Sequence, residues 1–199
     1  MANHYKNNYY TLDKIPKHRI EYIDKTVYTF AEDFHLKYWP LDFVQIILNI
    51  QQTQSLPIQI KSLGNLSYKF EAATVYSRKN NKFLIVVNKN KIHYPFKISK
   101  HRRLNFTLAH ELGHIYLKHY LLPQECKTQK DLYIEELEAD EFAGRLLMPK
   151  NKMFSYRFSS INEIASDFNV SNWAVLKRLT NLKHSNLRFY KNSLVYTSI

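Results

Sequence analysis

Apolar residues recur at helical spacing in two stretches of the second half of the chain. The first stretch runs from about Arg102 to Tyr120, and the second begins near Glu135 and stops at Pro149, which cannot continue a helix. The apolar positions of the first are Leu104, Phe106, Leu108, Ala109, Leu112, Ile115, Tyr116, Leu117 and Tyr120; those of the second are Leu137, Phe142, Ala143, Leu146 and Leu147. We predict a buried helix followed by an amphipathic helix.

The residues before these helices predict a small sheet and further helices. Short runs rich in β-branched and aromatic residues favour strands, and Arg78 to Lys82 has the polar composition of a turn between two of them. The expected elements are helices at 27–38 and 41–52, a break at Pro57, and strands at 58–60, 70–76 and 83–88. The expected fold class is α+β, with a small antiparallel or mixed sheet against the helix at 102–120.

The C-terminal part is expected to be helical. Residues 161–171 lead into 173–182 as helix, short turn and helix, with Asn169 at the position that requires a left-handed backbone and Ser171 as an N-cap. Such a unit can bind DNA through its second helix, or it can pack on the rest of the protein. Residues 187–199 alternate weakly, which fits a final strand or a loose tail.

The first helix carries the sequence His110-Glu111-Leu112-Gly113-His114, an H-E-x-x-H pattern. Residues four apart share one face of a helix, so His110 and His114 can bind the same metal ion. Glu111 is offset by one residue, which places its carboxylate beside the metal. A base at that position can take a proton from a metal-bound water.

Two imidazoles leave a catalytic zinc site one protein ligand short. We assign Glu136, on the second helix, as the third ligand. Asp140 is one turn further along the same face and is expected to accept a hydrogen bond from a ligand histidine. Glu138 points to the opposite side and is less suitable as a ligand, and Glu135, Glu138 and Glu141 are expected to form a solvated face.

Gly113 is one of only three glycines in the chain. Glycine destabilises a helix interior, so we expect another backbone, or the substrate, to pass close to this position. A tolerated small residue is the alternative.

These motifs resemble the ImmA/IrrE family of metallopeptidases. The resemblance rests on residues 106–114 (FTLAHELGH) and on a second block that begins at Glu136 and continues through Ala139, Asp140, Phe142, Ala143 and 146–149 (LLMP). Thr74–Tyr76 and Phe83–Asn88 resemble the two strands that precede the metal helix in that family, and the residues after Pro149 resemble its helical tail. The first forty residues are not matched, and Asp140 stands where members often have Asn.

The resemblance implies a gluzincin-type site with one zinc ion (Zn2+) per chain. It makes His110, His114 and Glu136 the ligands and Glu111 the catalytic residue. It implies a metallopeptidase domain at 1–150 with a helix-turn-helix-like tail at 151–199 packed on it. It also implies a protein substrate, since enzymes of this family cleave helix-turn-helix repressors that control mobile elements, phages or stress genes.

Composition limits the protein to one domain with at most a small appendage. Its 199 residues include 45% hydrophobic residues, and no apolar run is long enough to cross a membrane. The polar N-terminus does not read as a secretory signal, and the single Cys126 suits a reducing, cytoplasmic compartment. The net charge of +12 fits either an anionic partner or the codon usage of an AT-rich genome; its densest cluster is Lys97, Lys100, His101, Arg102 and Arg103.

The sequence does not decide two features of the site, the strand that binds substrate and the donor that stabilises the oxyanion. Val86, Val87 and Asn88 either lie along the cleft and pair with an extended substrate, or form an ordinary core strand. The donor that would stabilise the oxyanion is not assigned; His93, His119, His184 and several tyrosines are candidates, and His119 is expected to lie off the metal face.

Three functions fit the sequence. The first is a site-specific zinc endopeptidase, the second a DNA-binding regulator, and the third a binding protein that acts as an antirepressor or toxin–antitoxin partner. An intact Glu111 favours the first, because a binding protein has no need for a base beside the metal.

Overall fold

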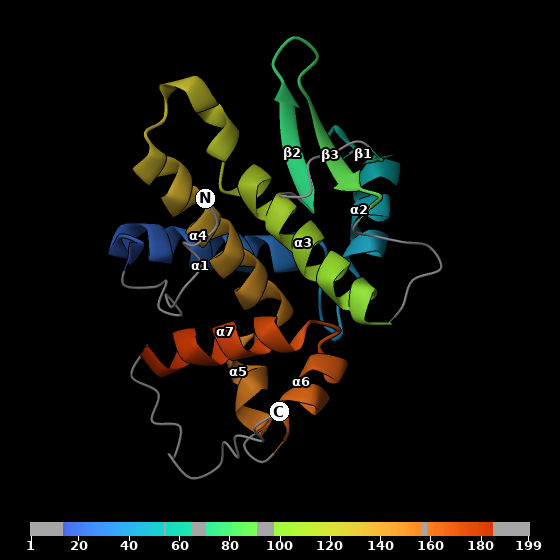
Figure 1. The fold of residues 1–199 in the computed structure, drawn as a ribbon, viewed down its shortest axis with the longest axis vertical. Coiled ribbons are helices and arrows are strands. Elements are labelled where there is room, and N and C mark those ends of the chain that lie inside the picture. The colour runs from blue at the N-terminus through green and yellow to red at the C-terminus, as the bar shows by residue number, and fades with distance from the viewer. Residues whose placement is uncertain (1–13, 54, 65–70, 91–97, 157–158, 185–199) are drawn as a thin grey trace.

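The computed structural model describes residues 14–53, 55–64, 71–90, 98–156 and 159–184. It is an α+β fold in which a small sheet lies beside a bundle of helices (Figure 1). The helices are α1 (Lys17–Asp33), α2 (Phe43–Gln52), α3 (Ile98–Tyr116), α4 (Gln129–Leu147), α5 (Lys150–Met153), α6 (Ile161–Asp167) and α7 (Asn172–His184). Three short 3-10 helices, η2 (His119–Leu121), η3 (Gln124–Cys126) and η4 (Phe154–Tyr156), connect them. The predicted fold class is therefore confirmed.

The sheet is mixed and has three described strands. They are β1 (Ile58–Leu63), β2 (Ala72–Ser77) and β3 (Lys82–Asn88), in the order β1-β3-β2. β1 runs parallel to β3, with Ile58 opposite Phe83, and β2 runs antiparallel to β3, with Thr74 opposite Ile85. The sequence placed all three strands to within a few residues, although Phe70, the expected start of β2, lies outside the described residues.

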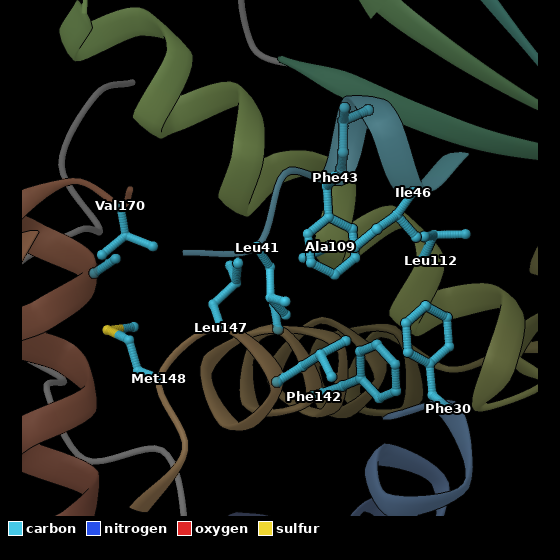
Figure 2. Close-up of a cluster of buried hydrophobic side chains, with 14 of the residues drawn as sticks. Phe30, Leu41, Phe43, Ile46, Ala109, Leu112, Phe142, Leu147, Met148 and Val170 are labelled. Atoms are coloured by element: carbon cyan, nitrogen blue, oxygen red, sulfur yellow. The ribbon is translucent and has the colours of Figure 1, made fainter. Parts of the chain in front are cut away.

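Helices α3 and α4 lie side by side in the middle of the molecule and share its hydrophobic core (Figure 1). Figure 2 shows the centre of this core, where apolar side chains from α1, α2, α3, α4 and the turn before α7 meet. The labelled members are Phe30, Leu41, Phe43, Ile46, Ala109, Leu112, Phe142, Leu147, Met148 and Val170.

The buried Asn105 of α3 joins three segments of the chain. Its side-chain oxygen accepts a hydrogen bond from the backbone nitrogen of Phe43, and its amide donates to the backbone oxygens of Leu41 and Asn169. Because a buried polar group is costly unless its hydrogen bonds are made, this residue ties α3 to the start of α2 and to the turn between α6 and α7.

Two helices end earlier than the sequence predicted. The N-terminal helix covers Lys17–Asp33 and not 27–38; it ends at Asp33 because His35 adopts a left-handed conformation (φ 51°) and the backbone nitrogen of Leu36 bonds back to Ala31. The helix with the H-E-x-x-H residues, α3, stops at Tyr116 and not at Tyr120, because Lys118 is also left-handed (φ 62°). That second turn redirects His119 into the interior, which a continuous helix would not do.

The C-terminal pair of helices agrees with the local prediction. Asn169 is left-handed (φ 51°), and the hydroxyl of Ser171 accepts a hydrogen bond from the backbone of Ala174 at the start of α7. α6 begins with a capping box between Ser160 and Glu163. Residues 187–199 lie outside the described part of the chain.

Candidate metal centre and cleft

A cleft of about 960 Å³ lies between β2, α3 and the first half of α4. Its lining includes His110, His114, Glu136 and Asp140, together with Glu111. α3 contributes the H-E-x-x-H residues and α4 contributes the two carboxylates, and these helices lie against one another in the fold (Figure 1). The residues that sequence analysis assigned to two separate helices are thus brought to one place.

Three side chains that could bind a metal converge in this cleft. The Nε2 atoms of His110 and His114 are 3.0 Å apart, and each lies 3.4 Å from a carboxylate oxygen of Glu136. Among the described residues, these three form a group that could hold a metal ion. Ligand atoms around a tetrahedral zinc with bonds of about 2.0–2.1 Å are themselves roughly 3.3 Å apart, so the spacing fits a zinc ion.

Each histidine is held through its other ring nitrogen. The Nδ1 of His110 lies 2.9 Å from Oδ1 of Asp140, and the Nδ1 of His114 lies 2.9 Å from Nδ1 of His119. A partner on Nδ1 leaves the lone pair of Nε2 for a metal and fixes the ring orientation. The expected Asp140 contact is present, and the His119 contact was not foreseen.

The electrostatics of the site favour a cation. Burial by itself lowers the pKa of His110, but hydrogen bonds to Asp140 and Glu136 outweigh it and raise that pKa to about 10. Hydrogen bonds from His110 and His114 lower the pKa of Glu136, and the pKa of Asp140 is lowered by His110 and Lys177 despite burial. The negative potential that favours a proton on His110 also favours a metal ion at the same position.

Glu111 lies beside the ligands and is nearly buried, with 5% of its surface exposed. The hydroxyl of Thr74 in β2 donates a hydrogen bond of 2.6 Å to Oε2 of Glu111. This contact joins residues 37 positions apart, so no local pattern in the sequence predicts it.

Glu138 and Glu141 do not belong to a solvated face, and that prediction is wrong. The side chains of both are only 2% exposed. Glu138 binds Arg19 of α1 and His119, and these partners, opposing the effect of burial, lower its pKa to about 2. Helical spacing places both residues off the metal face, but α1 and α7 cover that side of α4.

Glu141 is the centre of a buried polar cluster. Its carboxylate accepts hydrogen bonds from Arg145, Arg178 and Asn181, so it ties α4 to α7. Glu135 is less buried and pairs with Lys127, 2.7 Å away. All three acidic residues therefore have partners on other parts of the chain or one turn along their own helix.

The C-terminal helix α7 also reaches the site. Lys177 forms an ion pair with Asp140, which in turn contacts His110. The ammonium group of Lys177 lies 5.2 Å from the ring centre of Trp173, within cation–π range. Through this ion pair Lys177 contacts a residue that lines the cleft.

The substrate-strand hypothesis for Val86–Asn88 is wrong. β3 is the middle strand, with β1 on one side and β2 on the other, so its backbone has no open edge. These three residues are at most 7% exposed and form the ordinary core strand that was the alternative. β2 has β3 on one side, and no second neighbour within the described strands, and it lines the cleft.

The oxyanion candidates are narrowed but not assigned. Both ring nitrogens of His119 already have partners, His114 and Glu138, so neither is available to donate a hydrogen bond to an oxyanion. His93 lies outside the described residues, and so does the side chain of His184.

The basic cluster before α3 is described only in part. The structure does not describe Lys97 or the side chains of Lys100 and His101. The side chain of Arg103 forms an ion pair with Glu71.

Comparisons with known proteins agree with this architecture. The family model described as the IrrE N-terminal-like domain, a peptidase family, matches residues 79–180. A solved structure titled "Mycobacterium tuberculosis transcriptional regulator" has a similar fold, with a TM-score of 0.58 over 87% of this chain at 15% identity. The match covers 51% of that protein, so this chain spans about half its length.

No curated protein sequence matches this chain. None of the described helices is long and apolar enough to span a membrane.

Proposed function

Because this chain belongs to the family of IrrE N-terminal-like peptidase domains, we propose that it is a zinc-dependent endopeptidase. His110, His114 and Glu136 are the metal ligands, and Glu111 is the general base. The observation that carries the proposal is the convergence of two Nε2 atoms and one carboxylate within 3.4 Å, next to a buried glutamate in an open cleft.

The donor set suits zinc. Two imidazoles and one carboxylate match the composition of catalytic zinc sites, whereas magnesium and calcium prefer oxygen ligands. With these three residues as ligands, a zinc ion would keep one position for water or substrate. A bound zinc ion would supply a Lewis acid that brings the pKa of water toward neutrality.

The residues of the chain then have separate tasks. Glu111 accepts a proton from the attacking water and passes it to the leaving amine nitrogen as the peptide C–N bond breaks. Thr74 holds the Glu111 carboxylate in place through the 2.6 Å hydrogen bond. Asp140 orients His110, and Lys177 keeps the negative charge of Asp140 compensated.

The substrate would bind in an extended conformation along β2. This strand borders the cleft, its outer edge is open within the described sheet, and Thr74 links it directly to Glu111. Edge strands bind peptides by backbone hydrogen bonds. The resemblance to the ImmA/IrrE family makes a helix-turn-helix repressor the expected substrate.

A DNA-binding regulator remains the second candidate, since α6 and α7 have a helix-turn-helix form and the similar solved structure is titled a transcriptional regulator. The geometry of α7 counts against it. Its described basic side chains point inward: Arg178 binds Glu141 and Lys177 binds Asp140. A helix that reads bases in the major groove needs such side chains to be free.

The test compares wild type with Glu111→Gln and Glu32→Gln. Glu32 is an exposed residue of α1, so the second variant is the same substitution at a distance from the cleft. Each protein is loaded with zinc and co-expressed with a candidate helix-turn-helix repressor from the same genome, and repressor cleavage and bound zinc are measured. Cleavage by wild type and Glu32→Gln, with zinc bound but no cleavage in Glu111→Gln, is the expected result.

Release of the repressor from its operator by all three proteins, without cleavage by any, would exclude the peptidase and favour an antirepressor that acts by contact.

A further inference from the structure

His119 links the metal ligand His114 to a buried ion pair on the far side of α4. The two Nδ1 atoms of His114 and His119 are 2.9 Å apart, and Nε2 of His119 lies 2.9 Å from Oε2 of Glu138. Glu138 is in turn bound through both of its carboxylate oxygens by Arg19, with one contact of 2.7 Å from Nε. The path therefore runs from the cleft through His119 and Glu138 to α1.

The hydrogen-bond chemistry of this path has a single consistent direction. If Nε2 of His114 binds a metal, its proton is on Nδ1, which must donate to Nδ1 of His119. His119 then carries its own proton on Nε2 and donates it to Glu138. An ionised carboxylate only accepts, so Glu138 selects this arrangement, and the guanidinium of Arg19 keeps Glu138 ionised.

We propose that His119, Glu138 and Arg19 form a relay that fixes the tautomer and orientation of His114, so that α1 is a working part of the metal site. The proposal rests on the proposed metal centre and adds three positioning residues to it. Arg19 lies well before residues 79–180, so this support comes from outside the part of the chain that the family model matches.

The burial of the relay argues that it is more than a way to dock α1. The side chains of His119 and Glu138 are 5% and 2% exposed; a polar ring and a carboxylate charge buried so deeply are costly unless all their hydrogen bonds are made. Docking alone has a simpler solution in the same interface, because Asp24 of α1 already pairs with Arg145 of α4. Apolar contacts from Ile23 and Phe30 also hold α1 in the core.

The Asp24–Arg145 pair provides a matched control. Asp24→Asn removes the Asp24–Arg145 ion pair between α1 and α4 and leaves the relay intact. Arg19→Met removes the Arg19–Glu138 ion pair, which joins the same two helices and is part of the relay. Glu138→Gln keeps the shape of the side chain but loses the charge that selects the tautomer. Arg19→Lys keeps the positive charge beside Glu138 but not the two-pronged geometry.

The experiment measures the zinc dissociation constant of the full chain by competition with a chromophoric chelator. The visible spectrum of the cobalt-loaded protein reports the ligand geometry independently of activity, and thermal unfolding of the metal-free proteins reports folding. We expect Glu138→Gln and Arg19→Met to weaken zinc binding about tenfold to a hundredfold and to alter the cobalt spectrum, as removal of such partners does elsewhere. Arg19→Lys should fall between them and wild type, and Asp24→Asn should bind zinc as wild type does.

Two results would overturn the relay. One is unchanged zinc affinity and cobalt spectrum in folded Glu138→Gln and Arg19→Met; the other is an equal loss in Asp24→Asn, which would reduce the effect to the docking of α1. If either occurs while wild type binds zinc and cleaves in a Glu111-dependent manner, only the relay fails. If wild type binds no zinc, the proposed function fails with it.

Discussion

Replacement of Gly113 by Ala should destabilise the protein, although alanine is the better helix former. A Cβ atom at Gly113 would lie 3.1 Å from Cδ1 of Phe142, 3.2 Å from Cα of Ala139 and 3.3 Å from the backbone oxygen of Ala139. Two of these three neighbours are backbone atoms of a buried helix, which cannot rotate away. α3 and α4 would have to separate by a few tenths of an ångström.

The two opposing terms can be compared. Alanine gains about 0.8–1.0 kcal/mol over glycine in a helix interior. Overpacking a well-packed interface costs about 1–3 kcal/mol. We therefore expect a net loss of roughly 0–2 kcal/mol in the free energy of unfolding, together with weaker zinc binding, because the same helices carry the ligands.

Gly144 in α4 is the matched control. Its nearest neighbour for an added Cβ is Cδ of Arg178 at 3.6 Å, an ordinary contact with a flexible side chain. Gly144→Ala should therefore raise the free energy of unfolding by up to about 1 kcal/mol.

The assay is urea unfolding of the metal-free proteins, so that differences in zinc affinity do not affect the result. The free energies of unfolding are compared only if the m values of the variants are equal. The two variants should differ by about 1–3 kcal/mol, with Gly144→Ala the more stable. A Gly113→Ala protein as stable as Gly144→Ala would show that the close approach of α3 and α4 is not what requires the glycine.

Further predictions concern the cleft and the C-terminal helices. Thr74→Val should lower kcat about tenfold with little change in KM, because Glu111 loses the partner that positions it, while Thr74→Ser should keep most of the activity; equal kcat in both would contradict this. Glu141→Ala should lower the free energy of unfolding by about 3–5 kcal/mol, since Arg145 and Arg178 are left without their shared carboxylate; a loss below about 1 kcal/mol in urea unfolding would refute the role of this cluster. Removal of zinc by a chelator should lower Tm by an amount that grows with the zinc concentration of the loaded sample, and a Tm independent of zinc would contradict a site of useful affinity.

Local features of the chain were predicted well from sequence. His110 and His114 share a face because the helical repeat alone places residues four apart together, and Asn169 was recognised because few side chains accept a left-handed backbone. Gly113 was singled out by its cost in a helix, and the structure supplies the reason, which is the backbone of Ala139. The residue that we propose as third ligand was also chosen from sequence, because Glu136 and Asp140 share one helical face, and the structure places Glu136 next to His110 and His114.

Errors arose where the surroundings of an element decide the outcome. Several glutamates close together on a helix predict a face that is exposed to solvent. Nothing in that local pattern indicates that Arg19, 119 residues away in sequence, binds Glu138. The order of strands in the sheet likewise decided that the strand with an open edge at the cleft, within the described sheet, is β2 and not β3. A single left-handed residue, Lys118, turned His119 from a position off the metal face into the partner of His114.

The sequence by itself determined the helix that carries His110 and His114, the position of Glu111 beside them and the family to which the chain belongs. Each depends on residues within one or two turns of each other, where backbone geometry leaves few choices. Only the tertiary structure decided which groups hold those residues in position: Thr74 for Glu111, Lys177 for Asp140, and His119 for His114. These contacts join separate elements, and their formation depends on how buried charges find partners when the whole chain packs.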